Sequence, residues 1–455
     1  MSLGEKRIIQ SWEKQYGYPP MFGRKKLLLL IWPLLVEQLL NVFVGMVDVL
    51  MVATLGEAAV SGVALVDAVN NLIIQVLFAV TSGGTVVCAQ FVGAKDEKSA
   101  SRAGGQIFLL TISAMLLIMG VFLAGKTVLL GRMFGRVEAD VMRNSSTYLS
   151  LTALSFPFLA AYNSGASIFR ANGNTRIPML VSLLINGINI GGNALCIFVL
   201  GMGVEGVAIP TVIARAVAAV LVVWLLQTGN NQVKLRSSAD LRPDGRIIRR
   251  ILSIGIPNGI ESGLFQTGKV LLQSLVSTLG TASIAAFAVG SNLVTYMYLP
   301  GNALGAAMIT IVGQCYGAGE REQARFYARK LVVMNYALLA VICTVMALCR
   351  APLVGMYHLS AEADVMAQGL VLIHALAMTI WPVAFLLPYY LRATGKAAFT
   401  MLVAISSMWI FRIGLAYVFI RAFHFNVLGI WYAMFADWFF RFVVFAMKFH
   451  ASDKE

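Results

Sequence analysis

Long, continuous apolar runs separated by short polar connections dominate the chain. A transmembrane helix needs about 20 mostly apolar residues, whereas strands of a membrane barrel appear as alternating segments of about ten residues. Twelve runs of the helical kind lie near residues 27–55, 60–88, 105–125, 146–169, 178–200, 205–226, 251–279, 283–312, 330–350, 365–391, 397–422 and 426–447. The pattern predicts an all-α polytopic membrane protein with twelve transmembrane helices.

The two halves of the chain resemble each other at a nearly constant offset. Corresponding pairs are Pro33 and Pro257, Glu37 and Glu261, and segments 90–94 and 314–318 at an offset of 224, with 170–173 and 392–395 at 222. Six helices per repeat give both halves the same orientation across the membrane. The repeat therefore predicts two pseudo-symmetric six-helix lobes, an arrangement that many secondary transporters use.

These lobes divide the chain into five parts. In order, they are a cytoplasmic tail (1–26), an N-terminal lobe (27–226), a cytoplasmic inter-lobe loop (227–250), a C-terminal lobe (251–447) and a second cytoplasmic tail (448–455).

The composition indicates that lipid covers much of the chain. Of its 455 residues, 59% are hydrophobic and 12% are charged, whereas soluble proteins carry about 25% charged residues. So little charge cannot cover a soluble protein of this length, which excludes a soluble enzyme, a nucleic-acid module and a disordered scaffold.

The net charge of +14 indicates orientation and not a polyanion partner. Of the 35 Lys and Arg residues, 25 fall in the tails and in the loops on the same side, and six fall in the opposite loops. Because basic loops stay in the cytoplasm, both termini are predicted to be cytoplasmic, and no nucleic-acid partner is expected. Five scattered Cys without a CxxC pair, and four ungrouped His, predict no metal or redox cofactor.

Ionisable side chains inside spans are costly and are usually functional. Glu37 and Asp48 are eleven residues apart in the first span, which is about 20° of rotation, so they share a helix face. Further polar residues of the first two spans are Gln38, Asn41, Asp67, Asn70, Asn71 and Gln75. This group predicts a site that exchanges a proton or binds a sodium ion.

The seventh span carries its own polar group, consisting of Glu261, Gln266, Lys269 and Gln273. The last three are three and four residues apart and form one stripe. Lys269 is expected to neutralise Glu261 or a carboxylate of a neighbouring span. These four, with Gln38, are the predicted substrate cavity. Glu37 and Glu261 have a second interpretation, as matching inter-helix hydrogen bonds. Structural ion pairs are expected among Arg215, Arg412, Asp437 and Arg441.

Residues 32–41 read WPLLVEQLLN, residues 45–56 read GMVDVLMVATLG and residues 169–178 read FRANGNTRIP. With the paired Gln-x-x-Gly-Ala segments, the chain resembles the multidrug and toxic compound extrusion (MATE) family, most closely its bacterial DinF-like branch. The resemblance implies two six-helix lobes that export organic, often cationic, drugs in exchange for sodium ions or protons.

The resemblance also implies roles for individual residues. Asp48 matches the acid of the first helix that is central to cation coupling. The family's fifth helix often reads Asn-x-x-x-Asp, and here Asn189 is followed by Asn193, which argues against a proton relay there and leaves cation coordination open. Gln266 stands where the NorM-like branch has a seventh-helix Glu.

The resulting prediction is a secondary active transporter of the bacterial inner membrane that exports small cationic or amphipathic organic compounds by alternating access. Na⁺ or H⁺ would couple at Asp48, and no cofactor is needed; a monomer is compatible with the pattern. The helpers would be Glu37, Asn41, Asp67, Asn71 and Asn193. Alternatives are a lipid-linked saccharide or lipid flippase of a related fold, and an intramembrane enzyme, for which His374 lacks an evident sequence partner.

Overall fold

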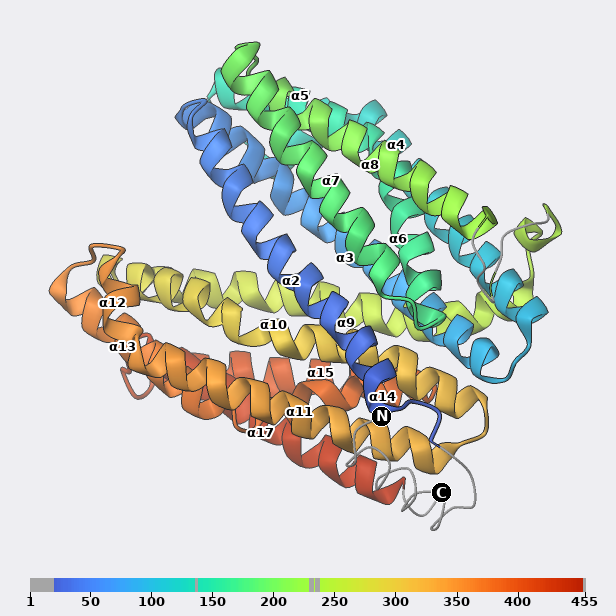
Figure 1. Ribbon diagram of the computed structural model, residues 1–455. Coiled ribbons are helices and arrows are strands. Elements are labelled where there is room, and N and C mark those ends of the chain that lie inside the picture. Colours follow the sequence, from blue (N-terminus) through green and yellow to red (C-terminus); the bar gives the residue numbers. More distant parts are fainter. Residues whose placement is uncertain (1–19, 136–137, 229–232, 234–237, 453–455) are drawn as a thin grey trace. The chain divides into compact units, whose positions relative to one another are not determined.

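The computed structural model describes residues 20–135, 138–228, 233 and 238–452, and every regular element in those residues is a helix (Figure 1). The first half contains α2 (Arg24–Ala53), α3 (Glu57–Gly93), α4 (Glu97–Phe134), α5 (Ala139–Leu154), α6 (Phe156–Ala171), α7 (Arg176–Ala194), the π-helix η1 (Leu195–Val199) and α8 (Glu205–Thr228). Parts of the predicted tails and of the inter-lobe loop lie outside the described residues.

The second half follows a similar order of helices. It contains the 3₁₀-helix η2 (Ser238–Leu241), α9 (Gly245–Ser277), α10 (Thr281–Gly317), α11 (Arg321–Leu348), α12 (Arg350–Gly355), α13 (Ala361–Ala377), the π-helix η3 (Pro382–Leu386), α14 (Leu387–Ala393), α15 (Ala397–Ser407), the π-helix η4 (Met408–Gly414), α16 (Leu415–Arg421) and α17 (Leu428–Ala451).

Within the described residues, nine helices are long and apolar enough to cross a membrane, and a bent pair supplies a tenth span. That pair, Ala361–Ala377 and Pro382–Ala393, bends by 71°. The two remaining predicted spans are α5 with α6, a helix broken at Ser155, and α9, which carries three arginines near its start and Glu261 and Lys269 further along.

The described chain packs as two compact units. One comprises the described residues up to Gly259 with Gly313–Gly319, and the other comprises Ile260–Val312 with the described residues from Glu320 onward. In the first unit α7 packs on α8, and α4 packs on both α3 and α6. The core of the second unit contains the buried tryptophans Trp381, Trp431 and Trp438.

The repeat appears in the structure as two equivalent ion pairs. In the first unit, Arg170 at the end of α6 donates a hydrogen bond to the Glu37 carboxylate on α2. In the second, Arg392 on α14 donates to both carboxylate oxygens of Glu261 on α9, at 2.8 and 2.9 Å. The arginine of each repeated segment thus binds the glutamate of its own half, so the matching inter-helix hydrogen bonds are present.

The repeated Gln-x-x-Gly-Ala segments also contact each other within the first unit. A Cβ atom on Gly93 of α3 would overlap the backbone carbonyl of Gln314, and a Cβ on Gly317 of α10 would overlap that of Gln90. Glycine at both positions allows the two helix ends to touch through their backbones.

A buried glutamine anchors the described end of the inter-lobe loop. Gln106 of α4 donates to the backbone carbonyls of Asp240 and Arg242, at 3.2 and 2.9 Å, and its side-chain oxygen accepts from the Asp244 N–H at 3.1 Å. The loop is therefore tied to the α4 helix of the first unit just before α9 begins.

Candidate functional site

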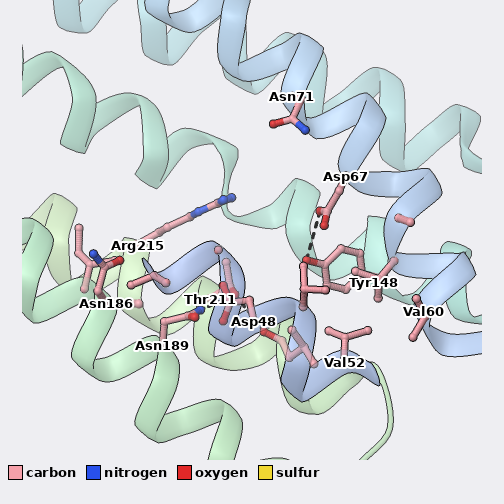
Figure 2. Close-up of a pocket in the computed structure, with 18 of the residues that line it drawn as sticks. Asp48, Val52, Val60, Asp67, Asn71, Tyr148, Asn186, Asn189, Thr211 and Arg215 are labelled. Atoms are coloured by element: carbon pink, nitrogen blue, oxygen red, sulfur yellow. Dashed lines mark hydrogen bonds between the residues drawn. The ribbon is translucent and has the colours of Figure 1, made fainter. Parts of the chain in front are cut away.

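A cavity of about 710 Å³ opens among α2, α3, α5, α7 and α8 of the first unit (Figure 2). Valine side chains such as Val52 and Val60 supply much of its apolar lining. The polar residues that line it are Asp48, Asp67, Asn71, Tyr148, Asn186, Asn189, Thr211 and Arg215. Two carboxylates and one guanidinium make the charged lining acidic overall, which favours cations.

Asp48 is connected to two other helices by a chain of hydrogen bonds. The side-chain amide of Asn193 donates to Asp48 Oδ1 at 3.0 Å and to Asn189 Oδ1 at 3.2 Å. The amide of Asn189 donates in turn to Thr211 Oγ1 at 2.8 Å. The chain therefore runs from α2 through α7 to α8, and the buried Oδ1 of Asn193 has no hydrogen-bond partner among the described residues.

Asp67 is held from two sides by neutral donors. The Tyr148 hydroxyl on α5 donates to Asp67 Oδ1 at 3.4 Å (Figure 2). The Asn70 amide, one turn along α3, donates to the same oxygen at 3.4 Å. Arg215 lines the same cavity but donates to Ser155 Oγ at 2.6 Å. In the described part of the chain neither Asp48 nor Asp67 forms an ion pair.

Local backbone features place the α7 amides. Gly192 lies against Pro210, where a Cβ atom would press on the proline ring, so α7 and α8 approach closely enough for Asn189 to reach Thr211. The π-helix η1 begins two residues after Asn193. Such π-turns occur often at functional sites because they change the direction of side chains within a helix.

The structure brings together four of the six residues predicted for cation coupling. Asp48, Asp67 and Asn71 line the cavity, and Asn193 bonds to Asp48. Glu37 lies eleven residues before Asp48 on α2, and it is buried against Arg170 and does not line the cavity. Asn41 is exposed and also lies outside the lining.

The residues predicted for the substrate cavity fall into different surroundings. Gln38 is half-buried on α2 and does not line the first-unit cavity. Gln266, Lys269 and Gln273 all belong to α9. Because Glu261 binds Arg392, Lys269 does not neutralise it as expected; instead its ammonium lies over the Phe265 ring, 5.1 Å from the centroid.

The arginines that were expected to form structural ion pairs have two kinds of environment. Asp437 accepts from Arg441 at 2.8 Å and lies 3.9 Å from Arg412, so these three form the expected ion pairs in the second unit. Arg215 has a different environment, since it bonds to a serine at the edge of the first-unit cavity.

Sequence reasoning missed Thr211 and Tyr148 as members of the site. Both are uncharged, so charge gives no signal, and a threonine hydroxyl within a helix can simply bond to its own backbone. Thr211 does so, donating to the Val207 carbonyl at 2.9 Å. The Asn189-x-x-x-Asn193 pair on one helix face was the available signal that partner oxygens should be sought on the next span.

The model of the MatE family matches the chain twice, over residues 33–195 and 257–418. The chain belongs to the MatE family. The two matches begin 224 residues apart, which is the offset of the repeat in the sequence. The predictions of a MATE transporter and of twelve transmembrane helices in two six-helix lobes are thus confirmed, and as a family member the chain is a multi-pass membrane transporter and not an enzyme.

Three relatives show the range of similar bacterial sequences. The probable multidrug resistance protein NorM of Thermotoga maritima is 27% identical over 92% of this chain and 90% of its own length. The uncharacterized transporter YisQ of Bacillus subtilis is 27% identical over 90% of each chain. The multidrug export protein MepA of Staphylococcus haemolyticus is 22% identical over 82% of each.

Solved structures share the fold at lower identity. A multidrug resistance MATE transporter of the MOP superfamily, in an outward-facing conformation, superposes with a TM-score of 0.88 at 19% identity, covering 95% of this chain and 97% of its own. A MOP superfamily transporter from Pyrococcus furiosus, described as having a binding pocket of reverse polarity, gives a TM-score of 0.87 at 19% identity with the same coverage.

Proposed function

We propose that this MATE transporter is a cation-coupled antiporter that exports organic compounds while Na⁺ or H⁺ enters through the cavity of the first unit. The observation that carries the proposal is the pair of carboxylates, Asp48 and Asp67, that line one cavity without an ion-pair partner among the described residues. An ionisable residue inside a membrane span is costly unless a ligand or a proton compensates it.

Asp48 is the group through which binding of a cation would act on the helices. A proton on Asp48 turns a carboxylate that only accepts hydrogen bonds into a group that also donates one. The unpartnered Oδ1 of Asn193 is an acceptor close to that position. A sodium ion would instead use the oxygens of Asp48, Asn193 and Thr211 as ligands.

Either event changes the bond that joins α2 to α7, and α7 is bonded in turn to α8. Export is coupled to cation entry only if the cation and the cargo bind the same conformations with different affinities. A change in the bonding of Asp48 supplies such a difference, because it alters the hydrogen bonds that hold the first span to Asn193 of α7. Asp67 and Asn71 of α3 line the same cavity and would assist, and Glu37 would hold α2 to α6 through Arg170.

The proposed cargo is a small cationic or amphipathic organic molecule. A cavity of about 710 Å³ lies within the usual range for drug-sized ligands, about 300–1,000 Å³. The names of NorM and MepA relatives refer to multidrug resistance and export. We place the protein in the bacterial inner membrane with both termini in the cytoplasm, from its basic loops and its bacterial relatives.

The test is dye efflux from proteoliposomes with sodium and pH gradients imposed separately. We expect one of the gradients to drive export by the unchanged protein, and Asp48→Asn to lose most of that driven rate. Asp140→Asn is the matched control, because Asp140 is an exposed carboxylate on α5 that pairs with Arg143 one turn along its own helix. Full driven export by Asp48→Asn at normal protein level would refute the assignment of the coupling site.

A further inference from the structure

The second unit carries an uncompensated cation on a membrane helix. Among the described residues Lys269 of α9 forms no ion pair, and Glu261, the acid on the same helix, binds Arg392 with both oxygens. A lysine in contact with lipid at the centre of a span is energetically costly. Lys269 is exposed on the surface of the protein, so the face of α9 that carries it should border a space that admits water or a polar ligand.

A second cation approaches the same aromatic ring. The Arg412 guanidinium carbon lies 5.3 Å from the centroid of Phe265, and the Lys269 ammonium lies 5.1 Å from it. Among the described residues, Arg412 forms its one ion pair with Asp437, at 3.9 Å, and Asp437 forms a closer contact with Arg441, at 2.8 Å. Arg412 Nε is buried without a hydrogen-bond partner in the described residues.

The charges of this cluster therefore do not balance. Asp437 pairs with Arg412 and Arg441, and Lys269 joins them through the shared Phe265 ring, so the cluster holds one carboxylate and three cations. The first-unit cavity has the opposite imbalance, with two carboxylates and one arginine. Gln266 and Gln273 lie one turn before and after Lys269 on α9 and present neutral amide groups beside the ammonium.

We propose that Lys269 and Arg412, which both approach the Phe265 ring, form an anion-binding subsite that holds the acidic group of the cargo. This inference rests on the proposed export function and narrows its substrate class to amphipathic organic molecules that carry a carboxylate or sulfonate. Lys269 supplies the exposed ammonium for a charge-assisted hydrogen bond, and the mostly buried Arg412 supplies a second positive charge beside the same ring. The apolar part of the cargo would rest on neighbouring side chains such as Met408 and Trp409.

The experiment compares two probes that differ in a single charge. Rhodamine B has a free carboxylate, and in its ethyl ester that carboxylate is blocked while the aromatic cation is unchanged. Fluorescence anisotropy with the purified full-length protein in detergent measures both affinities. We expect the acid to bind more tightly than the ester, and Lys269→Gln to weaken binding of the acid by about tenfold or more, since a hydrogen bond to a charged group contributes about 1.5–3 kcal/mol.

Two variants make this test specific. Lys269→Arg keeps the positive charge and should retain the preference for the acid, which excludes a general folding defect as the cause. Lys126→Gln removes a lysine that bonds to Ser150 in the first unit and should leave both affinities unchanged. Equal binding of acid and ester by the unchanged protein, or the same acid-to-ester ratio in Lys269→Gln, overturns the subsite.

The two experiments distinguish failure of the anion subsite from failure of the proposed antiporter function. If neither ion gradient drives export but the acid preference depends on Lys269, the antiporter proposal fails and the anion subsite stands. If Asp48→Asn abolishes driven export while the ester binds as well as the acid, the antiporter proposal stands and the subsite is refuted.

Discussion

At the residue scale, the site depends on neutral side chains as much as on its acids. Asp48 could be identified from the sequence because a carboxylate within an apolar run stands out. Thr211 could not, because its importance lies in where α8 packs: its hydroxyl accepts from Asn189, which in turn accepts from Asn193, the partner of Asp48. That contact depends on the closeness of α7 and α8 at Gly192, which no local pattern encodes.

Thr211→Val tests this chain of bonds without altering any charge. Valine has nearly the same shape but no acceptor, so the Asn189 amide would be left without its partner, at a cost of about 1–3 kcal/mol. We expect the half-saturating concentration of the driving ion to rise by roughly five- to 100-fold, measured as gradient-driven efflux in proteoliposomes. Thr228→Val on the same helix is the control, since Thr228 is exposed and its hydroxyl donates to the Trp224 carbonyl of its own helix. An unchanged ion dependence in Thr211→Val would remove Thr211 from the site.

The Glu37–Arg170 pair makes a different prediction, about stability. Glu37 is buried, so Arg170→Gln leaves a carboxylate without its cation, and breaking a buried ion pair in this way costs about 3–5 kcal/mol. We expect a lower thermal midpoint in detergent for Arg170→Gln, and partial recovery in the double variant Glu37→Gln/Arg170→Gln, where no charge is left unpaired. A double variant less stable than the single one would contradict this account.

At the element scale, the sequence specifies the spans better than their interruptions. Apolar runs predict where helices cross the membrane because the bilayer demands a minimum apolar length. The break at Ser155 between α5 and α6, and the π-helices η1, η3 and η4, arise from packing against neighbouring helices. The spacing of residues along one helix also suggested that Glu37 and Asp48 act together, but their partners lie on different helices, α6 and α7.

The contact between the repeated glycine segments gives a prediction at this scale. Gly317→Val would force a branched side chain into the backbone of Gln90, so the adjoining ends of α3 and α10 would have to separate. We expect a lower thermal midpoint and slower driven efflux, and Gly93→Val should act in the same way because its position in the repeat is equivalent. Gly120→Val on α4 is the matched control, since open space surrounds that position. Wild-type stability and efflux in both variants would show that this contact is dispensable.

At the scale of the whole molecule, the strongest sequence signal was the repeat, and the double match of the family model reproduces it. The sequence could also predict an acidic group in the first lobe. It could not predict that Lys269 lacks a carboxylate, because its expected partner Glu261 is bound by Arg392 from another helix. The different charge balance of the two units is therefore a property of the fold that composition alone conceals.

Orientation in the membrane is the remaining whole-molecule prediction, and a native cysteine can test it. Cys349 is an exposed free thiol beside Arg350, at the end of a span that the basic-loop pattern places outside the cytoplasm, whereas Cys88 and Cys315 are buried. A membrane-impermeant maleimide should therefore label Cys349 in intact cells. Lys98→Cys in a Cys349→Ser background puts a thiol at an exposed position in the first turn of α4, on the predicted cytoplasmic side, and should be labelled only after permeabilisation. The reverse pattern would mean that the basic loops face outward, in conflict with the positive-inside rule, and would reverse the proposed direction of transport.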